Sequence, residues 1–128
     1  MSTFFGFEEL EVWKKCRHVK NEIHITIKSF PDIEKYRMAD QLSRSVRSIG
    51  SLIDEGHGRF SYPDQIHFFI HARGSLSESM SHLIDARDAN NISETMLQNY
   101  RIKVKEIERM LNGYLNYLRL KKDSKSND

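Results

Sequence analysis

Hydrophobic residues recur along most of the chain at alternating intervals of three and four positions, which is the spacing of one face of an α-helix. Four blocks show the pattern, within residues 12–30, 39–53, 66–83 and 97–118. The last block is the most regular and extends over three heptads: Leu97, Tyr100, Val104, Ile107, Leu111, Tyr114 and Leu118. Because each block has one apolar stripe that needs a partner, the pattern predicts four amphipathic helices packed against one another.

Capping residues indicate where these helices begin. The segments SFPD (29–32) and SYPD (61–64) each combine a serine, which can accept a bond from a free amide, with a proline suited to the first helical turn. For the last helix, Asn91 or Ser93 is the expected cap. The short connections predict an antiparallel up-down-up-down four-helix bundle, so the fold class is all-α.

The end of the second predicted helix is marked by two glycines. Gly56 follows Glu55 at the position where a left-handed C-cap is expected, and Gly58 then allows the chain to turn. No strand precedes these glycines, which excludes a phosphate-binding P-loop. We expect one domain over residues 1–121 and a disordered polar tail over residues 122–128.

Composition agrees with a helical protein and narrows its class. The 128 residues are 38% hydrophobic and 30% charged, a balance that suits long amphipathic helices. They include only two prolines, so little in the sequence interrupts a helix. The net charge of +2 is too small for a dedicated nucleic-acid binder. The lone Cys16 excludes an internal disulfide and indicates a reducing compartment. With no apolar run of about 18 residues and no signal-peptide pattern, we expect a cytoplasmic protein without a membrane partner.

A second, polar stripe follows the second predicted helix. It is offset by two positions, or about 200°, from the apolar stripe and therefore lies on roughly the opposite face. The third helix has a matching line. The members of the two lines are Gln41, Arg44, Ser48, Ser51 and Glu55, and His67, His71, Gly74, Ser75 and Glu78. An ordinary solvated face is one interpretation, but serine and glycine in place of lysine and glutamate favour a polar packing surface or a subunit interface.

These residues resemble a known family, the four-helix-bundle proteins encoded by intervening sequences within bacterial large-subunit ribosomal RNA genes. The resemblance covers about residues 4–120. It depends on FEELEVWKKC, FPDIEKYRMADQLSRSVRSI, DEGHGR and HFFIHARGSLSE. Its most specific positions are Phe30-Pro31 with Glu34, Gln41, Arg44, Ser48, Glu55-Gly56, Ala72, Gly74-Ser75 and Glu78.

The resemblance implies a bundle that assembles as a ring-like homo-oligomer, commonly a pentamer, with no established activity. The accessory proteins of diversity-generating retroelements, which work with nucleic acid, resemble it more distantly. The sequence departs from the family pattern at Leu52 and Asp54, where an asparagine and an alanine are usual.

Candidate catalytic and metal sites are weakly supported. His67 and His71 share a helix face and Glu78 lies two turns on, but the helix lacks the glutamate that marks a zinc protease. Glu55 and Glu78 could form an acid–base pair if their helices bring them together, yet no nucleophile accompanies them. We therefore predict no catalytic residue, no metal and no cofactor, and a protein that is not an enzyme.

Nucleic-acid binding is the main functional alternative. Residues 101–125 contain eight basic and three acidic residues. The candidates for phosphate contact are Arg101, Lys103, Lys105 and Arg109. They point in several directions around the helix, so a solvated face remains an equal interpretation. We expect a non-catalytic scaffold or adaptor that binds itself, with RNA, DNA or a protein as a possible further partner.

Overall fold

The structure, a computed structural model, describes residues 3–126. Its elements are a short 3-10 helix, η1 (Gly6–Glu9), followed by α1 (Glu11–Ile27), the one-turn α2 (Asp32–Lys35), α3 (Met38–His57), α4 (Tyr62–Asp88) and α5 (Glu94–Ser126). Within this range there are helices and connections but no strand, so the predicted all-α class is confirmed. None of these helices is both long enough and apolar enough to cross a membrane.

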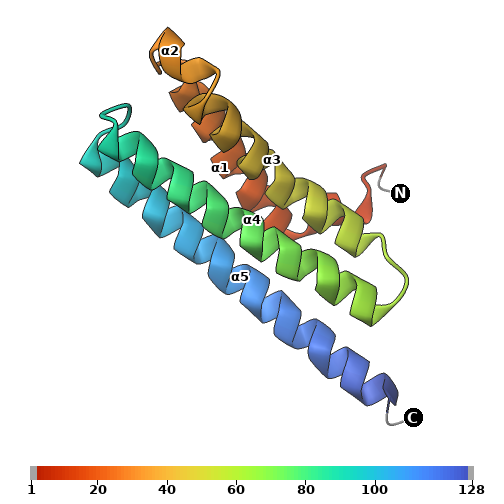
Figure 1. Ribbon diagram of the computed structural model, residues 1–128. Coiled ribbons are helices and arrows are strands. Elements are labelled where there is room, and N and C mark those ends of the chain that lie inside the picture. The colour runs from red at the N-terminus through yellow and green to blue at the C-terminus, as the bar shows by residue number, and fades with distance from the viewer. Residues whose placement is uncertain (1–2, 127–128) are drawn as a thin grey trace.

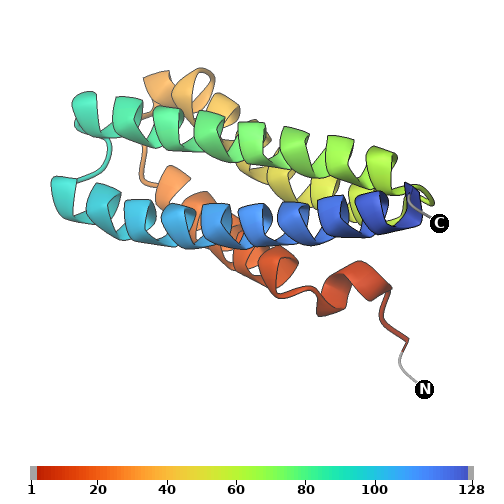
Figure 2. The ribbon, with the colours of Figure 1, turned by 90° about the horizontal axis from the view of Figure 1, so that it is seen from below.

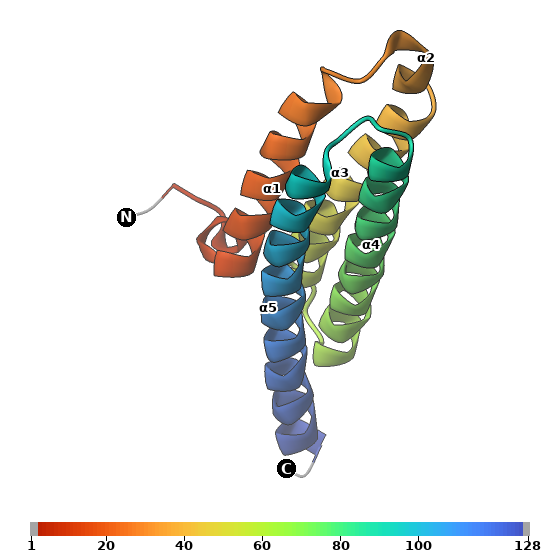
Figure 3. The same cartoon turned by 90° about the vertical axis from the view of Figure 1, so that its left-hand side faces the viewer.

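The four long helices form an antiparallel bundle (Figure 1). Around its axis each helix contacts the next in the cyclic order α1, α3, α4, α5 and back to α1. The views from below and from the side show α5 extending past the beginning of α1 toward the C-terminus (Figures 2 and 3). The first half of α5 therefore has α1 beside it, whereas its last turns do not.

One hydrophobic core runs through the bundle and is built from the predicted stripes. Leu42 and Ile53 of α3, Phe69 of α4, and Leu97 and Leu111 of α5 are completely buried. The buried face of each helix matches the three- and four-residue spacing of its apolar positions, with Leu115 added on α5. Burying each such side chain contributes about 1.5–3 kcal/mol, so these contacts dominate the stability of the fold.

The segment SFPD does not start the second long helix. Ser29 donates its hydroxyl proton to the carbonyl of Thr26 at 2.7 Å and so closes the end of α1 rather than capping a new helix. The single turn of α2 buries no residue. Helical structure resumes at Met38, one residue before the chain enters the core at Ala39, because buried apolar residues provide most of the stabilisation of a helix.

The two later helix starts follow the predicted capping chemistry. Ser61 accepts a bond from the amide of Asp64 at 3.2 Å, and Ser93 accepts one from the amide of Met96 at 3.1 Å. Asn91 has a different role, since its backbone N–H donates to the carbonyl of Ala86 at 2.8 Å and closes the end of α4. This is the six-to-one bond of a Schellman motif, and it follows a left-handed residue, Asn90, with φ of 62°.

The C-terminal segment differs from expectation. The sequence predicts a disordered tail over residues 122–128, but α5 continues through Ser126. Residues 127 and 128 lie outside the described part. The ammonium of Lys125 lies 5.9 Å from the ring centroids of both Phe60 and Tyr62, and that of Lys121 lies 5.7 Å from Tyr117. These cation–π contacts, together with the favourable placement of lysine at a helix C-terminus, account for the longer helix.

Candidate functional site

The predicted polar motif contributes to the contact between α3 and α4 through its serines. The hydroxyl groups of Ser48 and Ser75 are 2.7 Å apart. One turn further in, buried Ser79 lies 2.9 Å from the hydroxyl of Ser45 and also 2.9 Å from the carbonyl of Ser75. Small side chains thus bring the two helices together while their polar atoms satisfy one another.

The charged members of the motif do not join this contact. The Arg44 guanidinium binds Asp40 of its own helix at 3.0 Å, and its side chain is 79% exposed. Glu55 lies 3.9 Å from Arg59, and Glu78 lies 3.3 Å from His82. Gln41 is exposed as well. The pairing of Arg44 with a carboxylate is therefore local, and these charged residues lie on the surface of the bundle rather than in a buried network.

Two glycines of the motif have opposite surroundings. A Cβ atom on Gly56 would lie 2.9 Å from the Cβ of Phe68 and 3.0 Å from the ring of Phe69, so only glycine fits there. The prediction that Gly56 forms a left-handed C-cap is wrong, because α3 continues to His57 and the glycines of the described chain have no positive φ. A Cβ on Gly74, by contrast, would meet no atom within 4 Å.

The predicted phosphate-contact residues of α5 are separated by their neighbours. Lys103 binds both oxygens of the Glu22 carboxylate, at 2.6 and 2.8 Å, and so joins α5 to α1. Lys105 lies 3.4 Å from Glu108 on the opposite flank. Arg101 lines the same α4–α5 groove as Lys105, and Arg109 is exposed. The four cations therefore do not form one stripe.

The histidine pair of α4 does not gain a third ligand. The rings of His67 and His71 are 4.3 Å apart between centroids, while Glu78 is directed to His82. Among residues 3–126 no group of three or more histidine, cysteine or acidic side chains has the arrangement needed to hold a metal ion.

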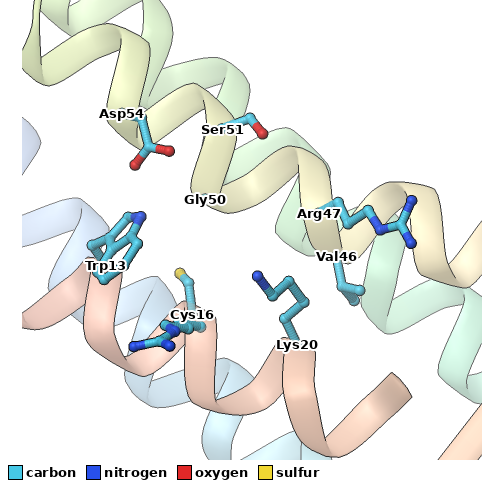
Figure 4. A pocket seen from close by; sticks show the side chains of 9 residues that line it. Trp13, Cys16, Lys20, Val46, Arg47, Gly50, Ser51 and Asp54 are labelled. Carbon is cyan, nitrogen blue, oxygen red and sulfur yellow. The ribbon is translucent and has the colours of Figure 1, made fainter. Parts of the chain in front are cut away.

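A pocket lies between α1 and α3 (Figure 4), and Ser51 is the only member of the predicted polar stripe among the described residues that line it. It has a volume of about 240 Å³. Its lining residues are Trp13, Cys16, Arg17, Lys20, Val46, Arg47, Gly50, Ser51 and Asp54. The polar members recur every three or four residues on both helices, and this spacing was the available signal. It was missed because the same spacing describes any solvated helix face.

Burial shapes the titration of this pocket. It raises the pKa of the Cys16 thiol to about 12, with the Asp54 carboxylate adding to the effect, so the thiol is neutral and unreactive. Burial likewise raises the pKa of Asp54, although the Trp13 indole N–H and the Lys20 ammonium oppose the shift. Oδ1 of Asp54 is inaccessible to solvent and has no hydrogen-bond partner in the described chain.

The fold and these surfaces define the class of protein: a small four-helix bundle. Some of its polar groups join one helix to the next, and the others lie on its exposed surfaces. Comparison then gives the family. The model of the family described as "23S rRNA-intervening sequence protein" matches residues 8–113, and the chain belongs to this family. Membership confirms the resemblance inferred from the motifs of α1, α3 and α4.

A solved structure agrees with the fold. The chain is similar to the crystal structure of a protein with unknown function from the S23 ribosomal protein family of Bacteroides thetaiotaomicron, with a TM-score of 0.75 and 22% sequence identity. The match covers 81% of this chain and 97% of that one. At this identity the likeness establishes the bundle alone. Among curated proteins, none matches this chain.

Proposed function

We propose that this protein is a non-catalytic scaffold or adaptor that assembles with copies of itself. The observation that carries the proposal is the outer face of α5, where Ile102 and Leu120 are 68% and 71% exposed. They are 18 residues apart, which is five helical turns or about 27 Å, and so lie on the same side of the helix. Tyr117, 49% exposed, lies beside them. Arg109 and Gly113 lie between them on this side, so the face is apolar at its two ends and mixed in the middle, as protein–protein contacts often are.

Glycine on the same face supports a close neighbour. A Cβ on Gly113 of α5 would meet no atom within 4 Å, as on Gly74 of α4. Glycine inside a helix costs about 0.5–1 kcal/mol relative to alanine, and nothing in the protomer requires it at these two places. The close approach of a second backbone would account for both residues.

The two open faces also suit a closed ring. A ring is built from heterologous contacts, in which one patch meets a different patch of the next subunit. The apolar face of α5 and the polar face of α3 and α4, with Arg44, Glu55 and Glu78, are two such patches on different sides of the bundle. The pentamer that the family resemblance implies is the expected subunit number.

Light scattering after size-exclusion chromatography tests this proposal. We expect a mass of about five times the 15.1 kDa of one chain. The double variant Ile102→Lys/Leu120→Lys should lower that mass, because two lysines replace the exposed apolar side chains of this face. The matched control is Ile33→Lys on α2, which is 73% exposed but lies away from α5. A monomeric wild-type protein, or a double variant of unchanged mass, would contradict the proposal.

Nucleic-acid binding through α5 stays a prediction and has less support. Lys103 and Lys105 already have carboxylate partners, which a phosphate would have to displace. Light scattering with short RNA and DNA duplexes at low and high salt tests it, since phosphate contacts weaken steeply as salt rises.

A further inference from the structure

The α1–α3 pocket gathers three cations that lack a carboxylate partner. Arg17 and Lys20 reach it from α1, and Arg47 reaches it from α3. Throughout residues 3–126 no carboxylate oxygen lies within 4.0 Å of any of the three. Arg44, one turn before Arg47, shows the usual arrangement, since it binds Asp40. The pocket therefore has three positive charges and a single carboxylate, Asp54, which forms no ion pair with any of them within 4.0 Å in the described chain.

The positive charge of the pocket also affects the pKa of a neighbouring histidine. His24 lies one turn beyond Lys20 on α1, and its ring nitrogen lies 3.2 Å from the hydroxyl of Ser43 on α3. Burial lowers the pKa of His24, and the charges of Arg47 and Lys20 lower it further. An anion bound near Lys20 and Arg47 would relieve this repulsion.

The other end of the pocket calls for a hydrogen-bond donor. Asp54 lies there beside Trp13, and the indole nitrogen turns toward the carboxylate (Figure 4). Oδ1 of Asp54 has no partner within the described chain. Oδ1 is closed to solvent, so a ligand N–H or O–H group would bond to Oδ2 of the same carboxylate and offset part of the cost of burying this charge.

The separation of the two ends sets the length of the ligand. Trp13 and Lys20 are seven residues apart on α1, as are Arg47 and Asp54 on α3, and seven residues span about 10 Å. The Lys20 ammonium points into the space between the helices, while Arg47 stands at its rim (Figure 4). A fitting ligand therefore carries an anion at one end and a donor about 10 Å away.

We propose that this pocket binds a small phosphate ester with a ring that bears N–H donors, of which a nucleoside monophosphate is the simplest example. The phosphate lies between Lys20 and Arg47. The ring lies against Trp13, where the Arg17 guanidinium is 5.8 Å from the indole centroid, with its N–H group on Asp54. The volume of about 240 Å³ falls just below the 300–1,000 Å³ of pockets for drug-sized ligands, which favours a small molecule over a macromolecule.

The test uses Trp13 as its own reporter, since it is the one tryptophan of the sequence. Adenosine monophosphate is titrated into the full-length protein, and both Trp13 fluorescence and heat of binding are recorded. Adenosine and inorganic phosphate are titrated separately. We expect saturable binding of the monophosphate, at least about tenfold tighter than either half alone, because two ends of the pocket are then occupied.

Variants assign the two ends. Lys20→Gln and Arg47→Gln should each weaken binding of the monophosphate about tenfold or more, whereas Lys28→Gln, a nearby exposed lysine outside the pocket, should leave it unchanged. Asp54→Leu should weaken the monophosphate but strengthen inorganic phosphate, because it removes both the acceptor and a negative charge. Circular dichroism of each variant verifies that it is folded.

Two results would overturn the proposal. One is a monophosphate affinity no higher than that of inorganic phosphate. The other is equal loss of binding in Lys20→Gln and Lys28→Gln, which would indicate attraction to the overall charge of the surface.

Discussion

The two sides of α3 are packed in different ways. Toward α4, Gly56 lets the helices approach until Phe68 and Phe69 fill the space, and Ser48 shares a hydrogen bond with Ser75. Toward α1, a glycine six residues earlier in the same helix, Gly50, has Trp13 as its nearest neighbour, with a Cβ-to-Nε1 distance of 3.9 Å. We call the α4 side, where complementary small residues fill the contact, the closed side. The α1 side, which contains the charged pocket, is the open side.

The two sides differ in how far their polar groups are satisfied. On the α4 side the buried Ser79 hydroxyl donates to that of Ser45, which in turn donates to the carbonyl of Leu42, so the contact adds to stability. On the α1 side the three cations have no ion pair within 4.0 Å in the described chain, and Oδ1 of Asp54 has no donor. Polar groups left unsatisfied in this way lower stability and are typical of sites that a ligand completes.

The largest effect expected from this comparison is on the closed side. Gly56→Ala would place a methyl group 2.9 Å from the Cβ of Phe68, a separation that requires the helices to move apart. Overpacking of this kind costs about 2 kcal/mol of unfolding free energy. Urea denaturation of the wild type and the variant measures the difference. An unchanged urea midpoint would show that the α3–α4 contact can accommodate the added methyl group.

A smaller effect of opposite sign is expected on the open side. Asp54→Asn keeps the shape of the side chain but removes a charge that burial disfavours. We expect a modest gain in stability at neutral pH, because the amide has no charge to bury, while the lost attraction to Lys20 limits the gain. Urea denaturation at a series of pH values measures it.

The pH dependence of the stability gain shows whether the buried charge of Asp54 causes it. The pKa of Asp54 is raised on folding, so the native state holds this proton more tightly than the unfolded chain does. Its contribution to stability therefore falls as pH rises from the unfolded value of 3.8 through the raised folded value. The advantage of Asp54→Asn should grow over that window and disappear below it. A constant advantage at all pH values would point to packing instead.

The fold could be predicted from the sequence because it depends on local spacing. The apolar stripe of α5, from Leu97 to Leu118, lies in the core as predicted, since a helix buries the face on which its apolar residues lie. The helix caps at Ser61 and Ser93 are local too. Gly56 is different, because its neighbours Phe68 and Phe69 come from another helix.

The pocket could not be predicted for a related reason. Whether a cation is paired depends on tertiary neighbours: Lys103 finds Glu22, 81 residues away, whereas Lys20 finds no carboxylate within 4.0 Å in residues 3–126. In the sequence both are ordinary lysines on polar helix faces. Asp54 stood out only as a departure from the family pattern, with no indication that it faces Trp13.

The smallest expected effect is that of Gly50→Ala, which allows a direct comparison of the open and closed sides of α3. Gly50→Ala introduces the same methyl group as Gly56→Ala, on the same helix, but at 3.9 Å from Trp13 it makes an ordinary contact. Alanine also restricts the unfolded chain more than glycine does, so we expect about 0.5 kcal/mol of added stability. Urea denaturation should thus show opposite shifts for the two alanines. A loss of stability in Gly50→Ala would mean that the open side of α3 is as tightly packed as the closed one, and the space for a ligand would be gone.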